Sequence, residues 1–251
     1  MKLLEGKTAL VTGAGSGFGK AMSLLYAEEG ASIIVSDISI DNGEKTVSEI
    51  KEKGGEAIFV EADVSRPEDN ERIVKEAVKA FRSLDIAFNN AGIGGASAPI
   101  GDYPIEDWDK IIKINLSSVF YGMHYQIPQM LKNGGGVIVN MASILGQVGF
   151  AGAAGYVAAK HGVVGLTKNV ALEYGTRGIR ANSIGPGFVD TNLTSKLTHD
   201  KEKYDFLVYK HPMGRLGKVD EVVDLVLWLS SPRSSFCNGG FYAVDGGYLA
   251  K

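Results

Sequence analysis

The stretch Thr12-Gly-Ala-Gly-Ser-Gly-Phe-Gly19 decides the fold of this chain. It follows an apolar run, 8–12, that is typical of a buried strand, and it opens a helical pattern over 18–29. Glycines at such a turn permit a tight bend and let the backbone approach a pyrophosphate, whose charge the helix N-terminus attracts. The stretch therefore predicts a dinucleotide site that includes Gly13, Ser16, Gly17, Phe18 and Gly19.

The rest of the chain repeats this order of strand and helix. Strands are expected at 8–12, 32–36, 57–60, 86–88, 136–140, 180–184 and 240–244, and helices at 18–29, 41–53, 67–82, 104–131, 156–175 and 219–230. Strict alternation implies right-handed crossovers and a parallel sheet. We expect an α/β fold: one Rossmann-type, doubly wound domain over residues 1–251, with about seven strands and helices on both faces. Residues 188–215 break the rhythm, and we expect them to be an irregular, mobile substrate loop.

Composition narrows the class of protein. The 251 residues are 45% hydrophobic and 22% charged, and the net charge is −3. No block of Lys and Arg stands out, which argues against nucleic acid or an anionic membrane as partner. One cysteine allows no intrachain disulfide, and four scattered histidines give no metal-binding spacing, so no metal is expected. The first residues, 1–7, lack the apolar core of a signal peptide, and we expect a cytoplasmic protein.

Asp37 lies where the second strand is expected to end, about twenty residues after the glycines. A carboxylate at this place accepts hydrogen bonds from the ribose hydroxyls of NAD and repels the 2′-phosphate of NADP. The next residue is Ile38, so no neighbouring cation compensates that repulsion. The sequence therefore favours NAD. The alternative is that Asp37 is only a solvated carboxylate at a strand end.

Tyr156 and Lys160 are four residues apart on an expected helix and share one face. A tyrosine has an ordinary pKa of about 10, so it acts as a base near neutral pH only if its pKa is lowered. A nearby ammonium group favours phenolate, and Ser143, at the expected end of the fifth strand, could hold a substrate oxygen. The alternatives are a surface pair for Tyr156 and Lys160, a cap for Ser143, and a buried backbone contact for Asn115.

The glycine spacing, Gly-x-x-x-Gly-x-Gly, is the first of several motifs in order. The others are Asp63-Val64, Asn89-Asn-Ala-Gly92, Asn115, Ser143, Tyr156-x-x-x-Lys160 and Pro186-Gly187. In this combination the chain resembles the short-chain dehydrogenase/reductase family over nearly its whole length. Three further segments, 87–92, 210–215 and 245–248, are similar to those of NAD-preferring branches that oxidise cyclic alcohols and diols.

The resemblance implies a role for each motif residue. Tyr156 is the acid/base, Lys160 lowers its pKa and binds the nicotinamide ribose, Ser143 orients the substrate and Asn115 anchors a water. The resemblance also implies a cofactor site of Gly13, Ser16, Gly17, Phe18, Gly19, Asp37, Ile38, Asp63, Val64, Asn90, Ala91, Gly92, Tyr156, Lys160, Pro186, Gly187, Val189 and Thr191.

The expected function is hydride transfer between NAD(H) and a neutral secondary alcohol or ketone, including cyclic ones. An NADPH-dependent 3-oxoacyl-carrier-protein reductase and a non-catalytic dinucleotide-binding protein are the alternatives. The family implies a homotetramer, and the small residues Ala158, Ala159, Gly162 and Gly165 would let two copies of one helix approach closely. Close packing of that helix on its own sheet is the other interpretation.

Overall fold

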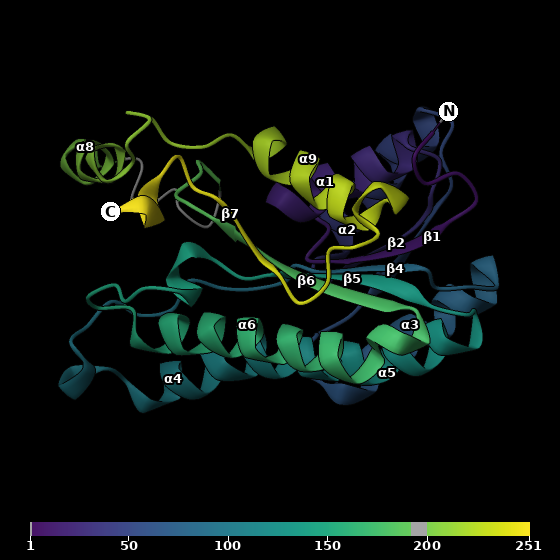
Figure 1. Cartoon of the computed structure of the whole chain (residues 1–251), viewed down its shortest axis with the longest axis horizontal. Helices are drawn as coiled ribbons and strands as arrows, with labels where there is room; N and C mark the ends of the chain where they lie inside the picture. Colours follow the sequence, from purple (N-terminus) through teal and green to yellow (C-terminus); the bar gives the residue numbers. More distant parts are fainter. Residues whose placement is uncertain (1, 192–199) are drawn as a thin grey trace.

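The computed structural model describes residues 2–191 and 200–251. These residues form one sheet of seven parallel strands in the order β3-β2-β1-β4-β5-β6-β7 (Figure 1). The strands are β1 (Thr8–Thr12), β2 (Ser32–Asp37), β3 (Ala57–Glu61), β4 (Ile86–Asn89), β5 (Gly136–Met141), β6 (Ile179–Pro186) and β7 (Phe241–Val244). The predicted α/β class and the parallel seven-stranded sheet are confirmed.

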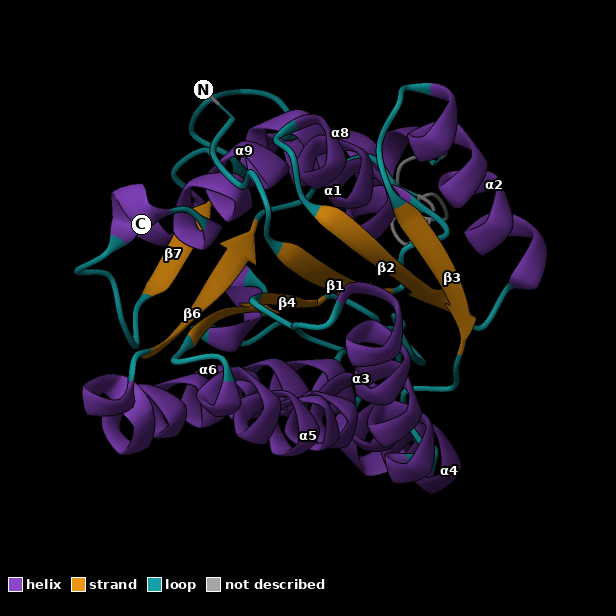
Figure 2. Ribbon diagram, turned by 90° about the vertical axis from the view of Figure 1, so that its right-hand side faces the viewer, coloured by secondary structure: helices purple, strands orange, loops and turns teal. Residues whose placement is uncertain are grey.

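Helices cover both faces of the sheet (Figure 2). One face carries α1 (Gly17–Glu28), α2 (Ile40–Glu52) and α9 (Val219–Ser230). The other carries α3 (Pro67–Phe81), α5 (Ser118–Lys132) and α6 (Ala154–Tyr174), with α4 (Ile105–Ile112) against α6. Neighbouring strand residues alternate between the two cores, as Leu10 and Val11 do. Both faces are thus apolar, which explains why the strands read as continuous hydrophobic runs.

The helix expected over 104–131 differs from the prediction. It is divided into α4 and α5 by five residues of π-helix, Lys113–Ser117, which contain the buried Asn115. Apolar periodicity continues through such a bulge, so the sequence pattern does not reveal it.

The expectation of an irregular segment over 188–215 is wrong for part of that range. Lys201–Lys210 form a helix, α8, whose N-cap is Asp200. The Asp200 carboxylate accepts hydrogen bonds from the backbone N–H groups of Glu202 and Lys203, at 3.1 and 3.2 Å, and so satisfies the first turn. Residues 192–199 of the predicted loop lie outside the described residues. In Figure 1, α8 lies beside the C-terminus.

No helix within residues 2–191 and 200–251 is long and apolar enough to cross a membrane. The same residues contain no group of three or more His, Cys, Asp or Glu side chains that could hold a metal ion.

Candidate active site

A cavity of about 530 Å³ lies at the carboxyl ends of the strands. Segments that follow β1 to β6 all contribute to its walls. The chain adds strands in opposite directions from β1 and β4, and ligands of open α/β sheets bind at such a switch point. The predicted residues that line this cavity are Gly13, Ser16, Gly17, Phe18, Asp37, Ile38, Asp63, Val64, Asn90, Ala91, Gly92, Ser143, Tyr156, Lys160, Pro186, Gly187, Val189 and Thr191.

Two predicted residues, Gly19 and Asn115, do not line the cavity. Gly19 has a packing role: a Cβ atom there would overlap the carbonyl oxygen of Gly13. Gly13 and Gly17 have φ angles of 64° and 51°, in the left-handed region that glycine favours. No side chain caps α1, so its first N–H groups remain available to an anion at the turn.

Asp37 ends β2 beside the glycine turn. Its two carboxylate oxygens accept hydrogen bonds from the backbone N–H groups of Gly15, at 2.8 Å, and Ser39, at 2.9 Å. A Cβ at Gly15 would lie 2.9 Å from one of these oxygens, so the approach requires glycine. Each carboxylate oxygen keeps a further lone pair, and together they can accept from a pair of ribose hydroxyls. These two acceptor oxygens therefore fit a nucleotide whose ribose has a free diol.

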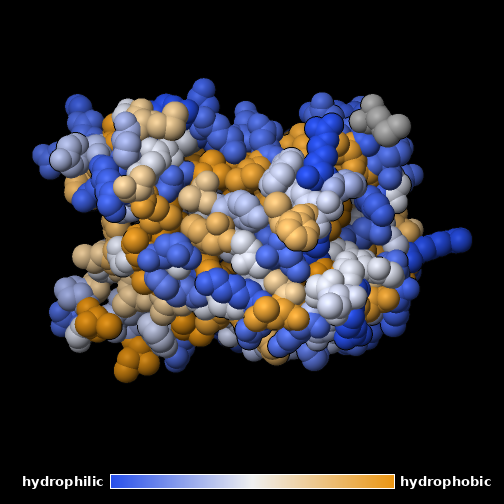
Figure 3. All heavy atoms as spheres, in the orientation of Figure 1, coloured by the Kyte–Doolittle hydropathy of each residue, from blue (hydrophilic) through white to orange (hydrophobic). Residues whose placement is uncertain are grey.

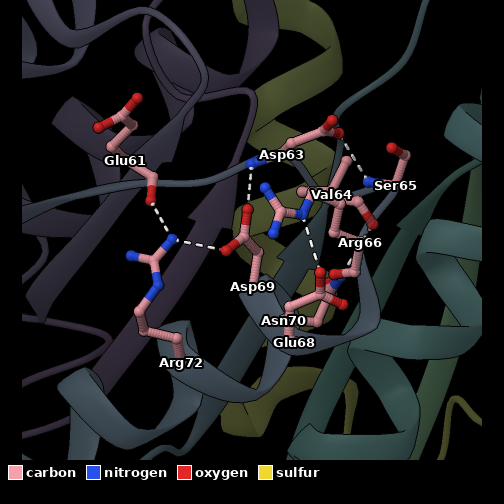
Figure 4. A network of polar contacts seen from close by, with 9 residues as sticks. All are labelled: Glu61, Asp63, Val64, Ser65, Arg66, Glu68, Asp69, Asn70 and Arg72. Atoms are coloured by element: carbon pink, nitrogen blue, oxygen red, sulfur yellow. Dashed lines mark hydrogen bonds and ion pairs between the residues drawn. The ribbon is translucent and has the colours of Figure 1, made fainter.

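The segment after β3 is held by a polar network at the start of α3 (Figure 4). The Asp69 carboxylate accepts from the backbone N–H of Asp63, at 2.9 Å, and from Arg72, at 2.8 Å. Arg72 also donates to the carbonyl oxygen of Glu61, at 2.8 Å. The network fixes the backbone of Asp63 and Val64, both of which face the cavity. Asp69 and Arg72 were missed by sequence reasoning, because their role depends on contacts across a turn.

A buried polar chain lies between the central strands and the helices beneath them. The amides of Asn89 and Gln126 bond each other, at 2.8 and 3.2 Å, and Asn89 donates to Asn140, at 2.9 Å. Asn140 then donates to Thr167 of α6, at 3.0 Å. The sequence identified Asn89 as the first residue of a motif, and its partners Gln126 and Asn140 were not predicted. These hydrogen-bonded side chains connect β4 and β5 to α6, the helix that carries Tyr156 and Lys160.

Ser143, Tyr156 and Lys160 come together in the cavity wall. Lys160 is 3% exposed, and its ammonium group donates to the carbonyl oxygen of Met141, at 2.7 Å. The same nitrogen lies 5.5 Å from the centre of the Tyr156 ring. Ser143 is also buried, and its oxygen accepts from the N–H of Leu145, at 3.1 Å. The lysine is therefore a fixed interior group and not part of a surface pair.

The electrostatics of this group differ from the expectation. Burial raises the pKa of Tyr156 above the ordinary value of 10, and a hydrogen bond with Ser143 lowers it in part. Burial lowers the pKa of Lys160 to about 8. In the protein alone, desolvation outweighs any help that the ammonium gives the phenolate. The expectation that Lys160 brings the pKa of Tyr156 below its ordinary value is therefore not met without further positive charge.

Asn115 bonds the backbone of the cavity wall. Its amide accepts from the N–H of Ile93 and donates to the carbonyl of Ile93, both at 2.8 Å. These contacts agree with the alternative interpretation of the sequence, in which Asn115 makes a buried hydrogen-bonded contact with the backbone. Ile93 itself lines the cavity, so Asn115 acts on the site through that residue. The anchoring of a water by Asn115 stays a prediction.

A parallel sheet with a glycine turn and a fixed carboxylate at its carboxyl edge defines a dinucleotide-binding fold. Residues 13–249 match a family model described as enoyl-(acyl carrier protein) reductase. The chain belongs to the short-chain dehydrogenase/reductase family, and it is a dehydrogenase of that family.

The chain is similar over its whole length to several known proteins. The chain is 47% identical to cyclohexanol dehydrogenase of Acinetobacter sp. (strain SE19), over 98% of this chain and 96% of that protein. It is 39% identical to 2,5-dichloro-2,5-cyclohexadiene-1,4-diol dehydrogenase of Sphingobium indicum, over the full length of both. A solved structure from Beutenbergia cavernae, proposed to be an NAD(P)-dependent gluconate 5-dehydrogenase and holding NADP at low occupancy, is 36% identical. It has a TM-score of 0.94 over 99% of this chain and 98% of that one.

Proposed function

We propose that this protein oxidises neutral cyclic secondary alcohols to ketones with NAD, and catalyses the reverse reduction with NADH. The observation that carries the proposal is that one cavity is lined by Asp37 at one end and by Ser143, Tyr156 and Lys160 at the other. The names of the two curated relatives, which denote dehydrogenases of cyclic alcohols, support the choice of substrate.

The side chains around Ser143 suit such a substrate. Ile144, Leu145, Phe150 and Phe188 line the cavity, and all four are apolar. No arginine is among the residues that line the described cavity, so a carboxylate or phosphate on the substrate would meet no guanidinium partner there. A neutral ring with one hydroxyl would bury its carbon atoms against these side chains and present its oxygen to Ser143 and Tyr156.

In the proposed reaction the Ser143 hydroxyl donates to the substrate oxygen and holds it beside Tyr156. Tyr156, as phenolate, takes the proton of the substrate hydroxyl, and as phenol it returns a proton in the reverse direction. Bound NAD supplies an acceptor for the hydride of the carbinol carbon and, while oxidised, a positively charged ring. That charge favours the phenolate, as does the Lys160 ammonium, against the desolvation that raises the pKa of Tyr156.

The choice of NAD over NADP rests on Asp37. Its carboxylate is fixed by two backbone N–H groups, so it cannot turn away from a 2′-phosphate without losing both bonds. Ile38 beside it is 68% exposed and offers no charge. The NADP in the Beutenbergia cavernae structure is bound by that protein. The proposed preference of the present protein for NAD rests on its own Asp37 carboxylate.

A spectrophotometric screen tests the proposal. Purified protein is given NAD with cyclohexanol, cyclohexane-1,2-diol and acyclic secondary alcohols, and NADPH with 3-oxoacyl thioesters. We expect NADH formation with cyclic alcohols, and a kcat/KM at least about tenfold lower when NADP replaces NAD, because the Asp37 carboxylate meets a phosphate. Efficient reduction of the thioesters with NADPH, without turnover of cyclic alcohols, would instead identify a 3-oxoacyl reductase. Absence of all turnover, with dinucleotide still bound, would identify a binding protein.

We also propose a cytoplasmic homotetramer. Exposed apolar side chains gather over the α4 end of the molecule in Figure 3. Ile100, Ile105 and Trp108 in this part of the chain are 83%, 79% and 39% exposed. Of the small residues of α6, Gly165 faces open space, but Gly162 packs against Leu116 of the same chain. Sedimentation velocity at micromolar concentration tests the proposal, and a monomer would contradict it.

A further inference from the structure

His211 is a buried histidine that the proposed chemistry does not use. It follows α8, is 3% exposed, and bonds two separate parts of the backbone. Its Nε2 atom lies 3.2 Å from the N–H of Phe188, and its Nδ1 atom lies 2.7 Å from the carbonyl oxygen of Leu207. Because a backbone N–H can only donate, Nε2 is the acceptor and Nδ1 carries the hydrogen. The neutral ring therefore connects the end of α8 to the segment after β6.

The close approach of these two segments depends on Gly187. A Cβ atom at this position would lie 2.7 Å from Nε2 of His211 and 3.0 Å from the Cα atom of Asp245. No larger residue fits between the β6 exit and His211 without moving one of them. Gly187 itself lines the cavity. The contact is thus part of the wall of the site.

Phe188 is held in a cluster of aromatic rings. The His211 ring meets it edge-on, with centroids 6.0 Å apart and planes at 86°, and Tyr248 lies 6.1 Å away. His211 and Tyr248 also contact each other, at 5.4 Å. Phe150 lies 5.8 Å from Phe188. Phe150 and Phe188 line the cavity, and the other two rings support Phe188 from outside it.

The same histidine attaches α8 to the body of the protein. Leu207 is the buried residue of α8, at 2% exposure, and its carbonyl receives the Nδ1–H of His211. Tyr204, Phe206 and Tyr209 of this helix are exposed. The position of α8 relative to Phe188 therefore depends on a small buried contact, with His211 at its centre.

We propose that His211 is a positioning residue for substrate selection. By accepting from the Phe188 N–H and packing on the Phe188 ring, it fixes Phe188 opposite Phe150. The two phenyl rings then form an apolar wall, the phenyl wall, that a cyclic substrate contacts and a small acyclic alcohol does not reach. This inference rests on the proposed function and adds to it the residue that makes the site prefer rings.

Two variants separate the two hydrogen bonds of His211. In His211→Asn, the amide N–H can still donate to the Leu207 carbonyl, but no acceptor reaches Phe188. In His211→Gln, the amide oxygen lies near the position of Nε2 and can accept from Phe188. Asparagine resembles histidine at the δ position and glutamine at the ε position, so the pair tests which contact matters.

The measurement is kcat and KM of each variant for cyclohexanol, for 2-propanol and for NAD. With His211→Asn we expect kcat/KM for cyclohexanol to fall about tenfold, mainly through KM, and kcat/KM for 2-propanol to change less than about twofold. His211→Gln should recover most of the loss, and KM for NAD should stay the same in both. Phe188→Leu should reproduce the loss of ring preference without altering His211.

His161 provides the matched control. It is exposed on α6, and its Nδ1 atom bonds the carbonyl of the residue four positions earlier, Val157, at 2.9 Å, as His211 bonds Leu207. His161→Asn should leave the ratio of the two alcohol rates unchanged.

The outcomes distinguish this inference from the proposed function. If wild-type protein prefers cyclohexanol and His211→Asn keeps that preference, only the role of His211 is overturned. Equal losses with both alcohols in the Asn and Gln variants would mean that His211 only stabilises the fold, and would also overturn it. If the wild-type protein oxidises 2-propanol and no cyclic alcohol, the proposed function and the phenyl wall both fail.

Discussion

At the scale of single residues, burial acts on the ionisation of both Tyr156 and Lys160, which lie side by side in the cavity wall. Both are buried enough that each charged form is disfavoured: burial raises the pKa of the phenol and lowers that of the ammonium to about 8. A phenolate beside an ammonium would relieve both costs, since each charge favours the other. With a pKa of about 8, Lys160 is already an ammonium at neutral pH, so ionisation of Tyr156 would place a phenolate beside an existing positive charge.

Replacing the phenol tests its chemical role. Tyr156→Phe keeps the ring and removes the proton carrier, so we expect kcat to fall about 10²- to 10⁴-fold, the usual contribution of a general base. Binding of NAD should change little. NADH absorbance gives the rate, and Tyr174→Phe at the other end of α6 is the control. Unchanged NADH formation with every accepted alcohol would contradict the mechanism.

The pKa of Lys160 has a consequence for stability. In the folded protein it is about 8, and in the unfolded chain it returns to its ordinary 10.5. Between these values the unfolded state binds more protons, so the contribution of Lys160 to the free energy of unfolding rises with pH, by up to about 1.4 kcal/mol per unit. Below pH 8 this contribution is constant and unfavourable.

Urea unfolding of the cofactor-free protein at pH 7, 8 and 9 measures this effect. Between pH 8 and 9, wild-type protein should gain stability relative to Lys160→Met. Lys168→Met, an exposed lysine of the same helix, should follow the wild type. Parallel curves for wild type and Lys160→Met would show that Lys160 keeps its ordinary pKa in the folded protein.

At the scale of elements, the beginning of α3 illustrates how a helix serves a binding loop. Asp69 and Arg72 lie in its first two turns, and both reach back to the segment that leaves β3 (Figure 4). Burial opposes ionisation of Asp69, but hydrogen bonds from Arg72 and from the backbone of Asp63 hold its pKa below the ordinary value. The carboxylate is therefore charged at neutral pH and fixes the loop through two donors.

Asp69→Asn removes that charge and leaves one acceptor oxygen for two donors. We expect KM for NAD to rise about 3- to 10-fold, because a charge-assisted bond that positions Asp63 and Val64 is weakened. At saturating NAD, kcat should stay the same. Glu68→Gln is the control, since Glu68 is exposed and pairs with Arg66 at the surface. A fall in kcat with unchanged KM would assign Asp69 to another step.

The elements also show what the sequence could predict. All seven strands and the glycine turn follow from local signals: apolar runs, and glycines where the backbone must approach a neighbour. Local signals did not predict the π-helical segment at Asn115, because such a segment leaves the apolar periodicity intact. They also did not predict the helix α8, because its start depends on a cap at Asp200. The residues that line the cavity were mostly foreseen. The burial of Lys160, the partners of Asn89 and the contact of His211 with Phe188 arise only when distant segments pack.

At the scale of the whole molecule, the sheet separates two tasks. Segments after β1, β2 and β3 provide the glycine turn, Asp37 and Asp63, and segments after β5 and β6 provide Ser143 and Phe188. Strand β4 lies between the two sets, paired with β1 on one side and with β5 on the other. One rigid sheet thus holds the proposed dinucleotide and alcohol positions at a fixed separation.

Binding of NAD to the folded state should stabilise the entire molecule. At a concentration one hundred times Kd, the gain is about 2.7 kcal/mol, which corresponds to a rise in Tm of about 5–10 °C for a chain of this size. At the same concentration NADP should raise Tm less, because of Asp37. Asp37→Asn should reduce the difference between the two dinucleotides. Equal shifts with both in the wild-type protein would contradict the proposed preference for NAD.

The buried pair Asn89–Asn140 lies on the boundary between these two sets of strands. A gene recombined after β4 would exchange the segment that carries Ser143 and retain the segment that carries Asp37. The two halves of such a chimaera would meet through this amide pair, and also through the packing of α1 on α9 and of α3 on α5. Recombination between two relatives would therefore give a folded protein only where both parents keep compatible residues at all of these contacts.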